Sequence, residues 1–327
     1  MRAIVITKPG GPEVLQAREI EEPVPGPDDL LVEVKATALN RADLLQRLGR
    51  YAPTPEVRAD VLGLEMAGVV AATGTRVTEF KAGDRVFGLL GGGGYAQRVV
   101  IHRGMAARMP ERLSFVQAAA VPEVFITAHD ALFNWCGLQM GDRVLVHAVG
   151  SGVGTAAVQL ARCAGAFSLG TAGSADKLSK AKALGLNVGI NYRDEKFAEV
   201  VQRETRGQGV QAILDVVGAP YWEGNIASLA VRGHMVLVGT MGGAAAQVNL
   251  AALMGKRLSV HGTVLRARGV EEKIALAGQM KRHVLPLLES GAVQPVLDRV
   301  FPLEQAAEAH RYMESNANFG KIVLEVG

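Results

Sequence analysis

The chain has few of the residues that would build a disulfide framework or a membrane span. It holds two cysteines, Cys136 and Cys163, in 327 residues, and their spacing matches neither a paired-cysteine motif nor a Cys-rich zinc site. No apolar run reaches the length of about 18 residues that a membrane span needs, and the first residues lack the apolar region of a signal peptide. These features favour a cytoplasmic protein with no membrane partner.

The chain also lacks a marked excess of charge. Its formal net charge is +3, and charged residues make up 20% of it. Without a basic run or a platform of aromatic and basic residues, nucleic acid is not expected as the main partner. The length predicts about two domains of roughly 150 residues each, and a hydrophobic content of 49% suffices for sizeable cores.

Strand and turn patterns fill the first 120 residues. Alternating or apolar runs separated by Pro and Gly clusters predict short strands in a mostly antiparallel, barrel-like region. The strands are expected at 2–7, 15–21, 30–38, 65–72, 85–88 and 95–101, with a short helix at 40–47. Ser114 is a plausible N-cap for an Ala-rich helix that ends near residue 121, and a second helix is expected at 125–135.

In the middle of the chain, near-continuous apolar strands alternate with helices, which is typical of a parallel, doubly wound α/β sheet. The expected strands are 143–147, 168–171, 188–191, 212–217 and 234–239, with helices at 152–164 and 175–184. After about residue 270, a long helix (271–289), a strand near 300, a helix at 304–315 and a strand at 321–326 resemble the first region again. We therefore expect residues 122–269 to form a domain inserted into one made of 1–121 and 270–327.

The strongest local signal is a glycine-rich turn between an apolar strand and a helix. The turn comprises Gly150, Ser151, Gly152, Val153 and Gly154. Small residues let the backbone approach a pyrophosphate, and the helix that follows offers free N–H groups and a positive dipole end. By itself such a turn can be only a tight strand–helix connection. Within an α/β alternation it indicates a dinucleotide-binding Rossmann domain.

The region about 20 residues further on bears on the choice of nicotinamide cofactor. NAD-binding domains usually carry Asp or Glu there, but the end of the second strand carries no carboxylate. Ser174 and Lys177 can instead hold a 2′-phosphate, by hydrogen bonding and by charge. Asp176 argues for NAD, although in a first helical turn it can simply stabilise the helix dipole, and Lys177 can equally be a solvated helix lysine. The sequence favours NADPH.

The segment Gly63-Leu64-Glu65 is similar to the Gly-His-Glu motif that supplies a catalytic zinc ligand in medium-chain alcohol dehydrogenases. Leu64 stands in place of the histidine, and no cysteine precedes Cys136. A catalytic zinc needs about three protein ligands. No metal site is therefore predicted, and alcohol oxidation at a zinc ion is not expected.

The whole chain resembles the zinc-free quinone oxidoreductases of the medium-chain dehydrogenase/reductase superfamily, and within them the p53-inducible subgroup. The matching stretches are 40–47 with Gly49 and Tyr51, 62–65, 151–157, 171–174, 191–192, 221–223 and 320–325. Ser151 in the glycine turn also occurs in that subgroup. The resemblance implies a GroES-like catalytic domain (1–121 and 270–327), an NADP-binding Rossmann domain (122–269), and a homodimer or tetramer.

The resemblance also implies the residues that contact the cofactor. Gly150 to Gly154 would cradle the pyrophosphate, and Ser174, Lys177 and Tyr192 would surround the 2′-phosphate. Other positions would line the adenosine, the nicotinamide or its ribose: Thr127, Val217, Gly218, Gly239, Thr240, Met241, Val264, Leu265, Arg266 and Asn318. For Val217, Met241 and Leu265, plain core packing is the alternative interpretation.

Hydride transfer needs no Ser/His/Asp arrangement, since the cofactor carries the chemistry and the protein supplies position and hydrogen bonds. A quinone that accepts hydride becomes an oxyanion, which a hydrogen-bond donor can stabilise. Tyr51 and Asn40 are the candidate catalytic donors. Tyr51 can instead be a half-buried loop anchor, and Asn40 the N-cap of the following helix. His147, at the end of a buried strand, is expected to be a satisfied core histidine.

The predicted function is thus NADPH-dependent reduction of a small quinone. Two alternatives stay open. One is an NADPH-dependent enone or alkenal reductase, which the same fold and cofactor would serve. The other is a crystallin-like or RNA-binding protein that binds NADPH without turnover. An exposed strand edge at 258–263 can pair across a two-fold axis.

Overall fold

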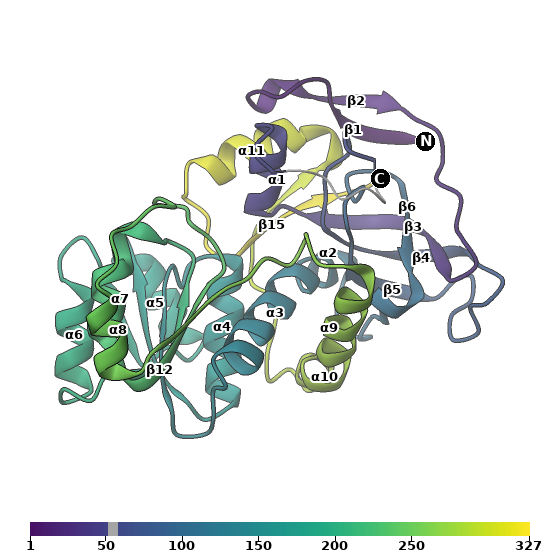
Figure 1. The fold of residues 1–327 in the computed structure, drawn as a ribbon. Helices are drawn as coiled ribbons and strands as arrows, with labels where there is room; N and C mark the ends of the chain where they lie inside the picture. The colour runs from purple at the N-terminus through teal and green to yellow at the C-terminus, as the bar shows by residue number, and fades with distance from the viewer. Residues whose placement is uncertain (52–57) are drawn as a thin grey trace. The chain divides into compact units, whose positions relative to one another are not determined.

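The structure, a computed structural model, describes residues 1–51 and 58–327 and divides into two compact units. Unit 1 comprises Met1–Ile126 and Arg266–Gly327, and unit 2 comprises Thr127–Leu265. Unit 1 is built on a mostly antiparallel sheet, and unit 2 on a wholly parallel one (Figure 1). The predicted fold class, a doubly wound parallel sheet inserted in a mostly antiparallel domain, is confirmed.

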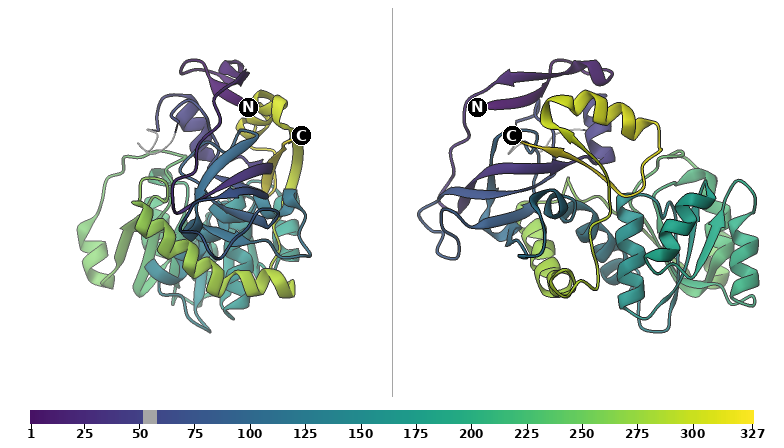
Figure 2. Two further views of the ribbon diagram at one scale, coloured as in Figure 1. Left: turned by 90° about the vertical axis from the view of Figure 1, so that its right-hand side faces the viewer. Right: turned by 180° about the vertical axis from the view of Figure 1, so that it is seen from behind.

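Unit 1 contains a seven-stranded sheet in the order β14-β15-β3-β4-β5-β7, with β6 paired to β3. The strands are β3 (Asp29–Ala38), β4 (Glu65–Thr73), β5 (Arg85–Leu89), β6 (Arg98–His102), β7 (Ala106–Arg108), β14 (Leu297–Pro302) and β15 (Lys321–Glu325). A separate ribbon pairs β1 (Arg2–Ile6) with β2 (Leu15–Glu19). Because β15 pairs antiparallel with β3, both ends of the chain belong to this unit (Figure 2).

Alternation along β3 shows why these residues form a half-covered sheet. Leu30, Val32 and Val34 are buried in the core of unit 1, while Glu33 between them points outward to an ion pair with Lys35. Successive strand residues face opposite sides of a sheet, so an apolar-polar alternation buries one face only.

The helices of unit 1 begin where the sequence carries capping residues. They are α1 (Arg41–Arg47), α2 (Phe115–Ala119), α9 (Val270–His283), α10 (Leu285–Ser290) and α11 (Ala306–Glu314). Ser114 caps α2 as expected, in a capping box with Gln117. The single helix predicted at 271–289 is wrong: the structure has two, because Pro286 in the first turn of α10 cannot donate the N–H that would continue α9.

Unit 2 holds six parallel strands in the order β10-β9-β8-β11-β12-β13. These are β8 (Arg143–Val146), β9 (Phe167–Ala172), β10 (Val188–Asn191), β11 (Val210–Asp215), β12 (Leu229–Leu237) and β13 (Ser259–Gly262). The helices are α4 (Gly152–Cys163), α5 (Ala175–Ala183), α6 (Phe197–Glu204), α7 (Trp222–Ser228) and α8 (Leu250–Lys256), and Figure 1 shows them packed against the sheet. Since the strand order reverses at β8, the loop after β8 lies at the switch point where such sheets bind ligands.

The helix predicted at 125–135 differs in its bounds and its winding. Helix α3 spans Pro122–His129 and continues as a π-helix over Asp130–Trp135. It begins earlier than expected because proline fits the first turn of a helix, where its missing N–H has no partner to lose. In the described part of the chain, no helix is both long and apolar enough to cross a membrane.

Candidate functional site

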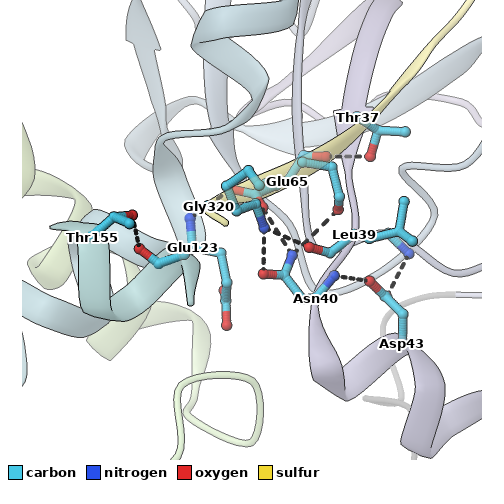
Figure 3. A network of polar contacts seen from close by, with 12 residues as sticks. Thr37, Leu39, Asn40, Asp43, Glu65, Glu123, Thr155 and Gly320 are labelled. Atoms are coloured by element: carbon cyan, nitrogen blue, oxygen red, sulfur yellow. Dashed lines mark hydrogen bonds and ion pairs between the residues drawn. The ribbon is translucent and has the colours of Figure 1, made fainter. Parts of the chain in front are cut away.

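A buried ion pair organises the polar centre of unit 1 (Figure 3). The ammonium of Lys321, at the start of β15, lies 2.7 Å from a carboxylate oxygen of Glu65, at the start of β4, and both side chains are almost fully buried. The same ammonium donates to Leu39 O at 2.6 Å and to Asn40 Oδ1 at 2.7 Å. Since β15 and β4 both pair with β3, the sheet itself brings these charges together.

Asn40 occupies the N-cap of α1, as one sequence interpretation held. Its side chain, however, faces the ion pair. Asn40 Nδ2 donates to Glu65 Oε1 at 2.8 Å and to Ala38 O at 3.3 Å, while Oδ1 accepts from Lys321. Both amide hydrogens therefore have protein acceptors, so Asn40 holds Lys321 and Glu65 in place, and its role as a donor to substrate stays a prediction.

Asp43 adds a second buried carboxylate. It accepts from Asn40 N at 2.7 Å, Gly63 N at 3.2 Å and Tyr95 Oη at 3.4 Å. Burial raises the pKa of Asp43 to about 6, against the lowering effect of the two backbone N–H groups. The carboxylate joins the first turn of α1 to the segment before β4. Gly63 there has φ +102°, and a Cβ would meet Gly94 Cα at 2.7 Å.

Three titratable side chains lie near this cluster: Tyr51, Glu123 and Arg266. The buried Arg266 guanidinium donates from Nε to Gly91 O at 3.3 Å, and its centre lies 5.3 Å from the centroid of the Tyr51 ring. Its terminal nitrogens Nη1 and Nη2 have no hydrogen-bond partner among the described residues. Burial lowers the pKa of Arg266 and raises that of Tyr51, which keeps the phenol protonated as a donor.

Glu123, in the first turn of α3, contacts the ion pair through its backbone. Its N–H donates to Glu65 Oε2 at 2.8 Å. Burial, with the like charge of Glu65, raises the pKa of Glu123 to about 8. At neutral pH its carboxyl group is therefore largely a protonated acid.

The glycine turn of unit 2 has the geometry of a nucleotide cradle. Ser151 is the N-cap of α4, and its Oγ accepts from Gly154 N at 3.0 Å. A Cβ on Gly154 would lie 2.3 Å from Ala148 O, so only glycine fits. Gly152 and Val153 are the first residues of α4, where backbone N–H groups have no helical acceptor. The turn thus offers N–H groups and a dipole end to an anion.

At the end of β9 the structure brings together the residues predicted for a 2′-phosphate. Ser174 is the N-cap of α5 and accepts from Lys177 N at 3.3 Å. Tyr192 follows β10, the neighbouring strand, and its Oη lies 2.5 Å from the point where Gly173 would carry a Cβ. Asp176 forms an exposed ion pair with Lys180 at 2.8 Å in the first turns of α5, in keeping with its interpretation as a helix-dipole residue.

Sequence reasoning missed one cation in this group. Arg193 directly follows Tyr192, and its Nε lies 3.4 Å from the same point above Gly173. A cavity of about 460 Å³ beside the group is lined by Tyr192, Arg193 and Tyr221, among others. The signal available was a basic residue immediately after a strand, which becomes meaningful only once β10 is known to lie beside β9.

The other predicted cofactor residues of unit 2 follow strand ends at the same edge of the sheet. Val217 N and Gly218 N both donate to the buried Asp215 at the end of β11. Gly239, Thr240 and Met241 follow β12, and Val264 and Leu265 follow β13. Met241 and Val264 are more than half exposed, so core packing does not account for Met241. Thr127 lies in α3, partly exposed.

Two further residues from the sequence analysis are Asn318 and His147. Asn318, in unit 1, is partly exposed and donates to Gly320 O at 2.9 Å just before β15. His147 is fully buried, with its ring nitrogens 3.0 Å from Thr171 Oγ1 and 2.7 Å from Asn225 Oδ1. The interpretation of His147 as a satisfied core histidine is confirmed, and burial lowers its pKa.

Leu64 stands at the position that supplies a zinc ligand in alcohol dehydrogenases, and here it belongs to the hydrophobic core. Leu64 is buried between Gly63 and Glu65. Across residues 1–51 and 58–327, no group of three or more His, Cys, Asp or Glu side chains is arranged to hold a metal ion.

Comparisons with known proteins agree along the whole chain. Residues 26–111 match the alcohol dehydrogenase GroES-like domain, and residues 184–324 match the family described as zinc-binding dehydrogenase. The quinone oxidoreductase of Sus scrofa is 32% identical over 99% of this chain and 97% of its own length. The match in sequence to this relative therefore extends over nearly the whole chain.

Three solved structures show the range of the relatives. Escherichia coli quinone oxidoreductase complexed with NADPH is 34% identical, with a TM-score of 0.89 over 99% of this chain and 100% of that one. An NAD-dependent alcohol dehydrogenase (35%, TM-score 0.89, covering 100% of both chains) and the CurK enoyl reductase (29%, 0.89, 100% and 99%) are similarly close. The full-length match to named quinone oxidoreductases places this chain in the quinone oxidoreductase family of the medium-chain dehydrogenase/reductase superfamily.

Proposed function

We propose that this protein is an NADPH-dependent quinone reductase that transfers hydride to a small quinone without zinc. The observation that carries the proposal is the full-length similarity to the E. coli quinone oxidoreductase complexed with NADPH. The geometry of the cofactor residues supports it. Membership of the p53-inducible subgroup is a finer proposal, based on the motifs around Tyr51 and Ser151.

The residues of unit 2 fit NADPH. The N-terminus of α4, with Ser151 and Gly154, would hold the pyrophosphate. Ser174 and Tyr192 would donate hydrogen bonds to the 2′-phosphate, and Lys177 and Arg193 would supply positive charge. When bound, NADPH supplies the hydride and leaves as NADP⁺. The remaining predicted contacts are Thr127, Gly150, Gly152, Val153, Val217, Gly218, Gly239, Thr240, Met241, Val264, Leu265, Arg266 and Asn318.

The residues of unit 1 fit the acceptor. A quinone that takes up hydride gains negative charge on oxygen, and donors prepositioned in a site of low dielectric stabilise that charge. Tyr51 stays protonated, because its pKa is raised by burial. Asn40 and Lys321 keep the neighbouring carboxylate of Glu65 neutralised, so that it does not oppose the developing charge.

The proposal is tested by following oxidation of NADPH or NADH at about 340 nm, where reduced nicotinamide absorbs, with ortho-quinones, para-quinones and enones. We expect fast NADPH oxidation with quinones. Lys177→Ala and Arg193→Ala should each raise KM for NADPH about tenfold and leave KM for NADH unchanged, since each removes a charge-assisted contact to the 2′-phosphate. Lys180→Ala, on the outer side of α5 and paired with Asp176, is the matched control.

A second candidate function is reduction of a polarised C=C bond in an enone or alkenal. The similarity to the CurK enoyl reductase favours it. Turnover with enones and none with quinones would retain the NADPH assignment and move the function to double-bond reduction. NADPH binding with no turnover of any acceptor would favour the crystallin-like or RNA-binding alternative.

The assembly is proposed to be a homodimer or tetramer, in the cytoplasm. Strand β13 pairs only with β12 within the described sheet, and an edge strand can pair with a second copy across a two-fold axis. A molar mass measured by light scattering at twice or four times 34.5 kDa would agree, and a monomer would contradict it.

A further inference from the structure

Two contacts hold the guanidinium of Arg266 in place, and neither involves its terminal nitrogens Nη1 and Nη2. It is 3% exposed. Nε donates to Gly91 O, and the central carbon of the group lies over the Tyr51 ring, 5.3 Å from its centroid. Nη1 and Nη2 are buried without a partner in the described chain. Buried donors are nearly always hydrogen-bonded, because an unpaired one loses its contacts with water and gains nothing in return.

The neighbouring carboxyl groups do not accept hydrogen bonds from Nη1 or Nη2. Asp43 is the acceptor of hydrogen bonds from Asn40, Gly63 and Tyr95. Glu123 is largely uncharged at neutral pH, since burial raises its pKa to about 8. Neither carboxyl group is a hydrogen-bond partner of Nη1 or Nη2. Burial lowers the pKa of Arg266, and the charge of Asp43 opposes that effect. The cation therefore retains at least two N–H donors and much of its charge for another partner.

The shape and charge of the guanidinium at Nη1 and Nη2 indicate which kind of ligand can bind there. Arginine presents its N–H groups in a planar fork that matches an oxygen carrying negative charge. Nη1 and Nη2 are buried, so this end of the guanidinium is out of contact with water. The partner must therefore bring an oxygen acceptor into an environment of low dielectric, where such a hydrogen bond is strongest.

We propose that Arg266 binds the carbonyl oxygen of the acceptor and stabilises the oxyanion that forms there, with the Tyr51 ring in cation–π contact with the guanidinium to keep it in position. This assignment differs from the cofactor contact that the family resemblance implies, and it rests on the proposed reductase function. In this step, hydride forms an O–H bond at one oxygen of the quinone, the ring becomes aromatic, the other C=O becomes C–O⁻ against Arg266, and a proton from solvent completes the hydroquinone. NADPH is the reductant and becomes NADP⁺.

The test compares three variants with the wild type. Arg266→Met removes the donors, Arg266→Lys keeps the charge without the fork, and Arg311→Met removes an exposed arginine of α11 in the same unit. Four quantities are measured for each: kcat and KM for a quinone, the Kd of NADPH by fluorescence titration, and the Kd of 4-nitrophenolate, an analogue of the reduced acceptor, by its absorption. Activity of Arg266→Met is also measured with added guanidinium ion.

We expect kcat/KM for the quinone to fall about 10²–10³-fold in Arg266→Met and less in Arg266→Lys. The Kd of NADPH should stay within about threefold, phenolate binding should be lost, and guanidinium should restore part of kcat. Arg311→Met should match the wild type. A merely structural role would give neither rescue nor a selective loss of phenolate binding.

Other results would overturn the proposal. A parallel loss of NADPH affinity would assign Arg266 to the cofactor instead, and unchanged phenolate binding would remove the oxyanion role. If Arg266→Met does not fold, Arg266→Lys decides: phenolate affinity and kcat equal to those of the wild type refute the need for the fork. Wild-type protein that binds phenolate but reduces no quinone would refute the proposed function and leave the Arg266 site standing.

Discussion

Replacing Lys321 by methionine should destabilise unit 1 more than any exposed charge substitution. Its ammonium neutralises Glu65 at 2.7 Å and also satisfies Leu39 O and Asn40 Oδ1. Removing one partner of a buried pair leaves an uncompensated charge and typically costs about 3–5 kcal/mol. Because Glu65 keeps hydrogen bonds from Asn40 Nδ2 and Glu123 N, we expect a loss near the lower end, about 3 kcal/mol.

The double variant separates charge from packing. In Glu65→Gln/Lys321→Met neither position carries a charge, so the double variant should be less destabilised than the sum of the single changes by about 1–3 kcal/mol. Lys35→Met is the control, since its pair with Glu33 on the outer face of β3 is exposed and such pairs contribute at most about 1 kcal/mol.

The assay must report on unit 1. Both tryptophans, Trp135 and Trp222, belong to unit 2, so their fluorescence would follow the wrong unit. Hydrogen exchange of the β3 and β15 amides as a function of urea gives the free energy of opening for the sheet that holds Lys321. A loss below about 1 kcal/mol for Lys321→Met, or additive changes in the double variant, would refute the reasoning.

Two further changes test the cofactor turn and the partly exposed acid Glu123. Gly154→Ala places a Cβ 2.3 Å from Ala148 O, so the Kd of NADPH measured by fluorescence should rise at least about tenfold, whereas Gly255→Ala, which meets no atom within 4 Å, should leave it unchanged. Glu123 has a folded-state pKa of about 8 against a usual 4.5, so its contribution to stability is complete below the unfolded pKa and is lost as pH rises toward and through 8. Glu123→Gln should reduce the loss of unfolding free energy between pH 4.5 and 8 by about 1–2 kcal/mol after allowance for partial exposure. Tm measured against pH follows this change, and an unchanged pH profile would contradict the raised pKa of Glu123.

Features coded by local pattern were predictable from the sequence. The apolar strands of unit 2, the glycine turn and the Ser114 cap each depend on residues within about ten positions, and each is present. The parallel direction of these strands also follows from the alternation of strands with helices, because two parallel neighbours need a long crossover connection, usually a helix. The errors arose where a proline changed a helix boundary, at Pro122 and Pro286.

Features that depend on burial between distant segments were not predictable. Glu123 reaches Glu65 across 58 positions. Arg193 can be assigned to the cofactor site only from its approach to Gly173, directly after the neighbouring strand β9. A signal did exist for Lys321, a lone charge in front of the apolar run Ile322 to Leu324, because a buried lysine almost always has a partner. Its partner Glu65 could not be named without the sheet order.

Arg266 and Asn40 differ in whether their side-chain N–H groups are free to bind the electron acceptor. Within its described residues, the buried side-chain atoms without a partner are Gln46 Oε1 and the two terminal nitrogens of Arg266. An oxyanion needs donors, which Gln46 Oε1 is not, and both amide hydrogens of Asn40 already have acceptors. A donor that must break an internal hydrogen bond gives less net stabilisation than one that has none to lose. The geometry therefore favours Arg266, with Tyr51 beside it, over Asn40 as the residue that stabilises the reduced acceptor.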